Sequence, residues 1–384
     1  MNEVSDFVGR IRDVTGPGAH PLHEPVLGEV EIDFLSKCIR SGFVSSVGEF
    51  VTTFEEQLAS FLECNAVVAM SSGTAALHIA LLTMGVRPGD EVLIPSATFV
   101  ATANAVAYCG AVPHFIDIEW ETLGVDAHAL DTHLNAVAVR KGDEVVNRNS
   151  GRRISLCVPM HTFGHAVNMS ALHDVVREWG IPIVEDAAEA LGSSFQNRKC
   201  GTFGLVGVFS FNGNKTITTG GGGALATNDR SIAERARHLS TTAKLKHRWD
   251  FIHDEIGFNY RMPNVNAALG CAQLTRLKES LQSKRRLFDR YDEIFKGSNL
   301  GAMFSEPTDS QSNYWLQTFI LHREKSNYRD EILDRCNSDG LALRPLWAPL
   351  HTLRPFKNLP RAEMPVTMDL SLRAINLPSS AGIA

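Results

Sequence analysis

Residues 65–118 decide the fold, and they read NAVVAM (65–70), GTAALHIALLTMG (73–85), EVLIP (91–95), TFVATANAVAYCG (98–110) and AVPHFIDI (111–118). A short apolar run bounded by turn residues is typical of a buried strand, and a longer amphipathic run predicts a helix. The expected order is therefore strand, helix, strand, helix, strand. The turn sequence RPGD before EVLIP and Gly110 at the expected end of the second helix support these boundaries.

The same alternation continues with ISLCVPM (154–160), the helical pattern SALHDVVREWG (170–180) and the strand pattern IPIVE (181–185). Strands that alternate with helices indicate an α/β fold with a mostly parallel sheet. Residues 141–153 are polar and rich in Gly and Asn, which predicts a surface loop inserted into this series.

The pattern changes near residue 274. LTRLKESLQSKRRLFDRYDEIF (274–295) predicts a long charged amphipathic helix, and the turn-rich SEPTDSQSN (305–313) follows it. Strand and helix patterns beyond that point predict a smaller α+β unit. We therefore expect an N-terminal segment (1–25), a large domain (26–274) and a small C-terminal domain (275–384).

Composition narrows the possible partners. The chain has 384 residues, a formal net charge of −6 and no long Lys/Arg block, so nothing favours a nucleic acid or a membrane as partner. No apolar run has the length of a membrane span, and the N-terminus shows no signal-peptide pattern. Seven scattered cysteines without a CxxC pair argue against a disulfide framework or a zinc knuckle. We expect a cytoplasmic protein that acts on small molecules.

The most informative segment for chemistry is FSFNGNKTITTGGGGALAT (209–227), in which Lys215 lies in a polar, Gly-rich stretch between apolar runs. A lysine that attacks an aldehyde needs a desolvated site, and the glycines at 220–223 let the backbone pack beside a flat ring. A solvated lysine on a surface loop is the alternative reading of this segment.

Asp186 follows the apolar strand pattern IPIVE, and the carboxyl end of a parallel strand is where α/β sites gather. A carboxylate there could hold a proton on a pyridine nitrogen. Glu185 is the weaker candidate because neighbouring side chains in a strand point to opposite faces. The alternative is that Asp186 caps the N-terminus of a helix formed by AAEALG.

Two further segments also follow strands. SSGTAALHIALL (71–82) places a Ser/Gly/Thr turn at a helix N-terminus, where free backbone N–H groups and hydroxyls can bind a phosphate. PSATFVATANAV (95–106) places Phe99 at the start of the next helix, where its ring could stack on a cofactor or simply fill the core.

Other polar clusters are less specific. GFNYRM (257–262) contains Asn259 and Arg261, and Arg261 could pair with an anionic ligand or with surface carboxylates. His161 and His165 in HTFGH have i, i+4 spacing but lack the acid of a zinc motif, so we expect no metal and a structural or substrate-contacting His161. Trp347 and His351 could line a substrate entrance or pack in the core.

In this order, the segments resemble the DegT/DnrJ/EryC1/StrS family of nucleotide-sugar aminotransferases, from GFVSSVGEFVTTFEEQLASF (42–61) to RPLWAPLHTLRPF (344–356). The resemblance implies the aspartate aminotransferase fold (fold type I), pyridoxal 5′-phosphate (PLP) as cofactor, and a homodimer with shared active sites. It implies a sugar nucleotide as acceptor and L-glutamate as amino donor, giving the 4-amino sugar nucleotide and 2-oxoglutarate.

The resemblance also implies roles for individual residues. Lys215 matches the Schiff-base lysine and Asp186 the acid at the pyridine nitrogen. The cofactor-binding positions are matched by Gly73, Thr74, Phe99, Glu189 and Ser210, and Asn259, or Arg261 two positions further on, matches the residue that reaches the phosphate from the neighbouring subunit. Arg261 and His161 are the candidate substrate-contacting residues.

Two departures from the family pattern stand out. Glu189 replaces the His or Gln that many relatives have after EDAA, and Gly221 replaces the acid of GEGG. Both variants, together with the segments FVSSVG and NGNK, are similar to the sequences of the family branch that aminates UDP-linked 4-keto-6-deoxy-N-acetylhexosamines. The alternatives are a PLP-dependent sugar dehydratase, in which His replaces the lysine, and a non-catalytic sensor with the same fold.

Overall fold

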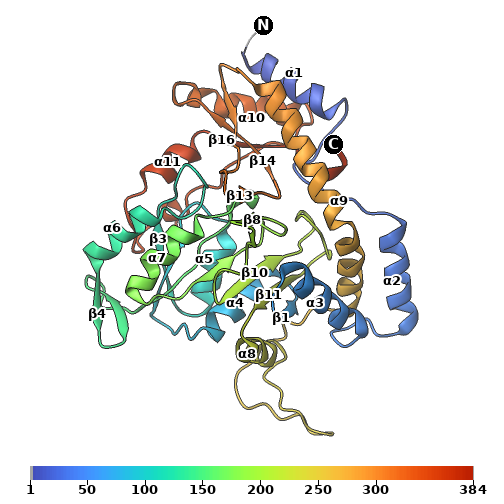
Figure 1. The fold of residues 1–384 in the computed structure, drawn as a ribbon, viewed down its shortest axis with the longest axis vertical. Helices are drawn as coiled ribbons and strands as arrows, with labels where there is room; N and C mark the ends of the chain where they lie inside the picture. The colour runs from blue at the N-terminus through green and yellow to red at the C-terminus, as the bar shows by residue number, and fades with distance from the viewer. Residues whose placement is uncertain (1–2, 384) are drawn as a thin grey trace.

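The computed structural model describes residues 3–383, and its main sheet runs through the middle of the large part of the molecule (Figure 1). A four-stranded ladder in the order β1-β11-β10-β7 continues into a three-stranded ladder in the order β6-β2-β3 through parallel bridges between β6 and β7. The strands are β1 (Ala66–Met70), β2 (Glu91–Pro95), β3 (Val112–Ile116), β6 (Ile154–Cys157), β7 (Val184–Asp186), β10 (Val206–Ser210) and β11 (Gly223–Thr227). Of these strands only β11 runs against its neighbours. The expected α/β fold with a mostly parallel sheet is confirmed.

Helices cover both faces of this sheet, because successive strand side chains point to opposite sides. In β1, Val67 and Ala69 pack into one apolar core, whereas Val68 and Met70 pack into the other. The first core is covered by α3 (Glu49–Leu62), α6 (Ala127–Val137), α7 (Met169–Trp179) and α9 (Asn264–Phe295). The second core is covered by α4 (Gly73–Thr83), α5 (Val100–Tyr108) and α8 (Arg230–Ser240).

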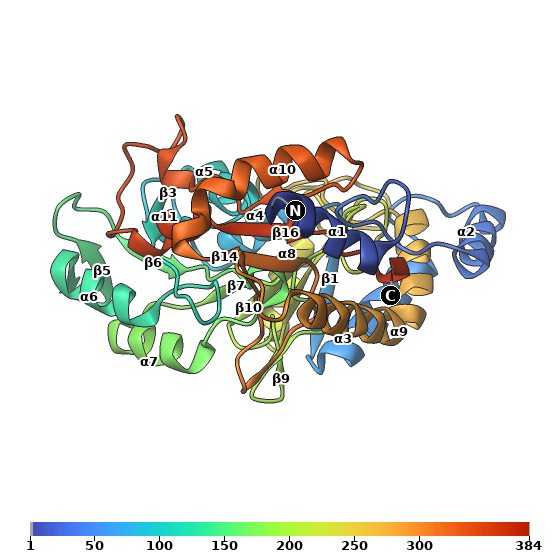
Figure 2. The ribbon, with the colours of Figure 1, turned by 90° about the horizontal axis from the view of Figure 1, so that it is seen from above.

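A second sheet forms the C-terminal part, seen from above in Figure 2. Its antiparallel strands, in the order β12-β14-β16-β15, are β12 (Gly301–Met303), β14 (Gln317–Leu321), β16 (Ala374–Leu377) and β15 (Arg344–Pro345). Its core also takes side chains from α9, from α10 (Arg329–Ser338) and from the N-terminal α1 (Glu3–Thr15). Phe7 of α1 lies 5.1 Å from Phe319 of β14 between ring centroids. The first helix therefore completes the core of the C-terminal part.

The remaining elements connect these two parts or lie on the surface. They are α2 (Glu29–Ser41), α11 (Pro365–Ser371), a small sheet of β8 (Ser194–Phe195), β9 (Arg198–Lys199) and β13 (Ser310–Gln311), and short 3₁₀ turns at Thr162–Gly164, Arg323–Tyr328, Leu350–Thr352 and Ala381–Ile383. Among residues 3–383, no helix combines the length and apolar character that crossing a membrane requires.

The long helix starts earlier than the sequence pattern predicts. α9 has 32 residues and begins at Asn264, so the small-residue stretch before residue 274 belongs to it. Gly270 lies in this stretch because α3 packs closely there: a Cβ at Gly270 would lie 2.6 Å from Cε2 of Phe54. The proposed domain boundary at 274/275 therefore falls inside a continuous helix, and the division into three parts remains a prediction.

The prediction of a surface loop at 141–153 is wrong for the first half of this range. β4 (Ala138–Lys141) and β5 (Glu144–Asn147) form an antiparallel hairpin. Gly142 has φ of 62°, a backbone conformation that suits a two-residue hairpin turn and that glycine adopts at little cost. The charged, exposed residues of this hairpin hid the strand pattern.

A buried polar chain joins this hairpin to the sheet. Glu91 at the start of β2 accepts hydrogen bonds from Asn147 (2.8 Å), from Ser150 (2.6 Å) and from Nδ1 of His114 (2.9 Å). Nε2 of His114 lies 2.7 Å from Nε2 of His133 on α6. Burial and the neighbouring His114 lower the pKa of His133 to about 4. His133 is therefore neutral in the folded protein at neutral pH.

The buried hydrogen bonds from Glu91 through His114 to His133 predict that the folded state loses stability in mild acid. Between about pH 6.5, where an unfolded histidine titrates, and about pH 4, the unfolded chain binds a proton at His133 that the folded chain does not. His133→Gln should make the fall in unfolding free energy over this window shallower. The slope against pH should decrease by at most the amount that the binding of one proton contributes. Urea unfolding measured across pH checks this. His128→Gln, at an exposed position of the same helix, is the control, and an unchanged slope in the His133 variant would contradict the assignment.

Candidate active site

A cavity of about 560 Å³ lies between the carboxyl ends of the main sheet and the C-terminal part. In α/β folds, ligands bind at these strand ends because the loops there can carry polar groups. The cavity is lined by residues that the sequence singled out, and these include Gly73, Thr74, Phe99, Asp186, Glu189, Ser210, Lys215, Gly221 and Trp347. The structure thus brings together segments that lie far apart in the sequence, from Gly73 to Trp347.

One wall of the cavity fits a phosphate group. α4 begins at Gly73, and the Ser72 side chain caps it by accepting a 3.0 Å hydrogen bond from the backbone N–H of Ala75. A Cβ on Gly73 would lie 2.9 Å from Cβ of Ser210, so glycine allows the helix N-terminus and the Ser210 side chain to meet. Backbone N–H groups at a helix start, with the hydroxyls of Thr74 and Ser210 beside them, form an anion site.

Asp186 lies at the end of β7 and is almost fully buried. Its carboxylate accepts hydrogen bonds from the Thr102 hydroxyl (2.7 Å) and from the backbone N–H of Ala188 (3.2 Å). Burial raises the pKa of Asp186, and these hydrogen bonds oppose the shift. The next element after β7 is the strand β8, which excludes the alternative that Asp186 caps a helix. Asp186 is a buried acid that faces a ligand cavity.

Lys215 is held inside the cavity. Its Nζ lies 2.9 Å from Oε1 of Glu189 and 3.8 Å from the ring centroid of Trp315. The Lys215 side chain is only 12% exposed, which excludes the alternative of a solvated surface lysine. Oε2 of Glu189 accepts a hydrogen bond from the backbone N–H of Phe163 (2.9 Å). Burial, opposed by Lys215, raises the pKa of Glu189 to about 7.

Sequence reasoning missed the residues that support this ion pair. Trp315 donates its indole N–H to the Asn214 carbonyl (2.8 Å), which fixes its ring against Lys215. Asn313 accepts from the backbone N–H of Trp315 (2.8 Å) and donates to the Glu189 carbonyl (2.8 Å). Asn313 is the last residue of the turn-rich stretch 305–313, and Trp315 follows in a strand-like run, so neither carried a signal of its own. The contact between Trp315 and Lys215, which lie far apart in the sequence, depends on tertiary structure.

His161 lies beneath the cavity and does not line it. Its Nε2 is 2.9 Å from Oε2 of Glu185, and its Nδ1 accepts the backbone N–H of Val167 (3.1 Å). The backbone N–H of His161 also donates to the Asp186 carbonyl (3.1 Å). Because both ring nitrogens are used within the core, the expectation of substrate contact is corrected in favour of the structural alternative.

Arg261 and Asn259 also lie outside the cavity of this chain. The Arg261 guanidinium donates to Glu55 (2.7 Å) and to the Ala69 carbonyl (2.9 Å), so it serves a buried ion pair in place of the expected substrate contact. Asn259 is exposed. Its expected contact is with the cofactor of a neighbouring subunit, and that contact remains a prediction.

Of the two candidates near the C-terminus, Trp347 lines the cavity and His351 does not. The Trp347 ring packs 4.8 Å from Phe163 and 6.3 Å from Phe99, between centroids. Nδ1 of His351 pairs with the Ser96 hydroxyl at 2.7 Å.

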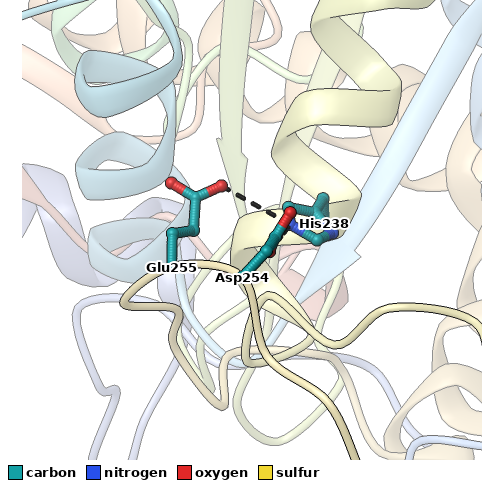
Figure 3. A group of neighbouring side chains, drawn as sticks. All are labelled: His238, Asp254 and Glu255. Carbon is teal, nitrogen blue, oxygen red and sulfur yellow. Dashed lines mark hydrogen bonds and ion pairs between the residues drawn. The ribbon is translucent and has the colours of Figure 1, made fainter.

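Within residues 3–383, one group of three side chains has the spacing of metal ligands: His238, Asp254 and Glu255 (Figure 3). His238 lies 2.7 Å from Asp254 and 3.4 Å from Glu255, and Arg235 pairs with both oxygens of Glu255. Arg235 and His238 of α8 therefore already face these carboxylates. We interpret the group as an ion-pair network that fastens residues 254–255 to α8.

Comparison with known proteins agrees with this site. The model of the DegT/DnrJ/EryC1/StrS aminotransferase family matches residues 25–384. The chain belongs to this family, and it is a PLP-dependent aminotransferase of fold type I.

Individual relatives cover nearly the whole chain. GDP-perosamine synthase of Vibrio cholerae is 35% identical over 366 residues, which are 94% of this chain and 94% of that protein. The putative pyridoxal phosphate-dependent aminotransferase EpsN of Bacillus subtilis is 38% identical over 331 residues, 86% of this chain and 82% of EpsN. The crystal structure of the aminotransferase TlmJ from Streptoalloteichus hindustanus has a TM-score of 0.85 and 30% identity, covering 96% of this chain and 95% of TlmJ.

The resemblance implies that Lys215 holds the cofactor and moves protons, so Lys215→Ala should remove the lysine-linked absorbance band of the bound cofactor and lower turnover by about a thousandfold or more. Absorbance spectra and steady-state rates check this. Lys199→Ala, which removes a lysine outside the cavity, should retain both properties. A Lys215→Ala protein that kept the band and the turnover would remove the assignment.

Proposed function

We propose that the chain transfers the amino group of L-glutamate to C4 of a nucleotide-linked 4-keto-6-deoxy sugar, giving the 4-amino sugar nucleotide and 2-oxoglutarate. The observation that carries this proposal is Lys215, buried beside Glu189 in the same cavity as Asp186 and the phosphate-binding wall. The family of the chain supports transamination, and the name of the Vibrio cholerae relative supports a nucleotide-linked sugar as substrate.

The residues present fit PLP. The N-terminus of α4 at Gly73 and Thr74, with Ser210, would hold its phosphate, and Asp186 would hold a proton on its ring nitrogen. Phe99 starts α5 at the cavity wall, where its ring can lie against the cofactor. When bound, PLP supplies an electron sink for the negative charge that develops at the substrate carbon. Lys215 would hold the cofactor through its amino group.

With PLP bound, the Lys215 amine would be placed to move a proton at the α-carbon of the donor. The pKa of Glu189 near 7 lets this carboxyl group hold or release a proton beside the lysine amine. Trp315, Phe163 and Trp347 surround the same space and exclude water from it.

Within this substrate class, two nucleotides have support. Glu189, Gly221, FVSSVG and NGNK favour UDP-4-keto-6-deoxy-N-acetylhexosamine, and we propose this sugar as the first candidate. The GDP-perosamine synthase relative favours a GDP-linked sugar as the second. A sugar dehydratase is disfavoured because Lys215 stands where dehydratases of this fold have His. A non-catalytic sensor is disfavoured because the charged groups of the cavity are intact.

Mass spectrometry of products from UDP-, GDP- and dTDP-linked 4-keto-6-deoxy sugars, each with L-glutamate, tests the proposal. We expect a 4-amino product and stoichiometric 2-oxoglutarate, with the highest kcat/KM for the UDP-linked N-acetyl sugar. Preference for the GDP-linked sugar would select the second candidate. A deoxygenated product without glutamate consumption would identify a dehydratase, and no turnover with any sugar would reject the proposal. Lys215→Ala is the negative control.

We also propose that the chain works as a homodimer with shared active sites. An arm formed within residues 244–256 extends away from the body of the molecule below α8 (Figure 1). Its side chains Trp249, Phe251 and Ile256 are 68%, 78% and 86% exposed. A second apolar set, with Ile39, Phe43 and Val47 more than 60% exposed, lies at and after the end of α2. Exposed apolar groups of this size are typical of an interface, and a second copy of the chain would cover them.

Complementation tests the shared site. Asn259→Ala should damage the site of the partner subunit, and Lys215→Ala should disable the site of its own chain. When the two inactive variants are mixed and allowed to exchange subunits, half of the dimers are hybrids with one intact site, so about a quarter of wild-type activity should return. Recovery of activity is measured by the glutamate assay. No recovery, despite dimer exchange shown by native mass spectrometry, would place Asn259 outside the neighbouring site.

A further inference from the structure

Lys284 is a fully buried lysine that none of the roles above uses. It lies in α9, and its exposed fraction is 0%. Its Nζ donates hydrogen bonds to the backbone carbonyl groups of Ser379 (2.7 Å), Trp315 (3.0 Å) and Tyr314 (3.4 Å). Among residues 3–383, Lys284 forms no ion pair with a carboxylate. Burial lowers its pKa well below the ordinary range of a lysine.

Stability alone does not explain an amino group in this position. A lysine that is buried without a carboxylate loses its hydration and gains no opposite charge in return. A methionine would fill a similar volume without that cost. Because strongly perturbed buried lysines gather at functional sites, the backbone that Lys284 holds is a candidate part of the active site.

One of the three carbonyl groups belongs to Trp315, whose ring contacts the lysine of the cavity. The Nζ of Lys215 lies 3.8 Å from the centroid of this ring, and both residues line the cavity. The indole N–H is bound by the Asn214 carbonyl, and the Trp315 backbone is bound by Lys284. An aromatic face attracts a cation, so the position of the ring favours the charged form of the Lys215 amine.

The Ser379 carbonyl joins Lys284 to the N-terminal segment. The backbone N–H of Ser379 donates to the carbonyl of Leu22 (2.7 Å), and Leu22 lines the cavity. The next residue, His23, is 8% exposed, and its ring centroid lies 6.4 Å from that of Trp315. Burial lowers the pKa of His23 well below its usual range, and the charges of the neighbouring lysines lower it further. At neutral pH, His23 therefore adds no charge behind the indole ring.

Two carboxylates also act on the Lys215 amine. Glu189 lies 2.9 Å from its Nζ, and the charge of Lys215 lowers the pKa of Asp186 against the effect of burial. Both acids belong to the main sheet and the loop that follows β7, whereas Trp315 comes from the C-terminal part. A change behind Trp315 can therefore alter the surroundings of Lys215 while both carboxylates stay in place.

We propose that Lys284 is a positioning residue of the active site: it holds the Trp315 backbone so that the indole ring lies against Lys215 and favours its protonated amine. The assignment rests on the proposed function, which makes Lys215 the lysine that reacts with the cofactor aldehyde. Only an unprotonated amine attacks an aldehyde. The position of the ring thus helps to set the pH range in which Lys215 reacts.

Capture of PLP by the cofactor-free, full-length chain tests this proposal without sugar or glutamate. The rate at which the lysine-linked absorbance band appears should rise with pH, because deprotonation makes the amine reactive. Lys284→Met removes the amino group and keeps an unbranched side chain. The midpoint of the pH profile should then fall by about 0.5 to 1 pH unit, because the displaced ring no longer favours the charged amine. Lys278→Met, at an exposed position of the same helix, is the matched control and should keep the wild-type midpoint.

A double-mutant cycle shows whether Lys284 acts through the ring. Trp315→Leu removes the ring and should lower the midpoint by itself. In that background Lys284→Met should cause no further fall, because the ring that it positions is already absent. Shifts that simply add would overturn the proposal. A rise of the midpoint in Lys284→Met would show that the lost positive charge dominates, and an unchanged midpoint would show a purely structural role; each of these results would also overturn it.

Circular dichroism and urea unfolding show whether each variant folds. If Lys284→Met does not fold, Lys284→Gln takes its place, because its amide N–H₂ group can still donate to one carbonyl group. This variant should give a smaller fall in the same direction, and no fall would overturn the proposal. If the wild-type enzyme aminated none of the sugars, the capture profile would still test the role of Lys284. A wild-type chain that formed no lysine-linked band would overturn both this proposal and the proposed function.

Discussion

The contact between Lys215, Glu189 and Trp315 is the interaction on which the rest of the site depends. A lysine and a glutamate are stable in a buried position only when each has a partner, and here each supplies the other. Glu189 is fixed from behind by the backbone of Phe163, and Trp315 is fixed by Asn214 and Asn313. These contacts come from the loops after β6, β7 and β10 and from the segment before β14. The ion pair therefore requires that the main sheet and the C-terminal part pack together correctly.

Much of this could be predicted from the sequence, for a physical reason. Residues that follow a parallel strand meet at one edge of the sheet, so Gly73, Phe99, Asp186 and Ser210 were placed together by the order of the strands alone. The burial of Lys215 was harder to predict, because a Gly-rich stretch is compatible with a surface loop as well as with a buried turn. Only its pairing with Glu189 and its contact with Trp315 distinguish the two.

What the sequence could not provide was the second wall of the cavity. Arg344 of β15 and Asn376 of β16 line this wall from short strands whose pairing is set by contacts far apart in the chain, and Trp315 lies just before β14. The prediction that His161 contacts the substrate was wrong for the opposite reason. Its motif is compatible with a ligand contact, but both ring nitrogens form hydrogen bonds in the core. Whether a polar residue of a motif faces a cavity or the core is visible in three dimensions alone.

The unbroken course of α9 limits how this cavity can respond to a ligand. The helix packs against α3 at its beginning and against α1 near its end, and 32 residues correspond to about 48 Å of helix. A hinge in the middle of α9 would break backbone hydrogen bonds. The helix therefore holds the main sheet and the C-terminal part, which form the two walls of the cavity, at a fixed separation. A ligand too short to bridge them would contact one wall and leave the other unsatisfied. The fold therefore selects substrates by their length from the reacting carbon to the diphosphate.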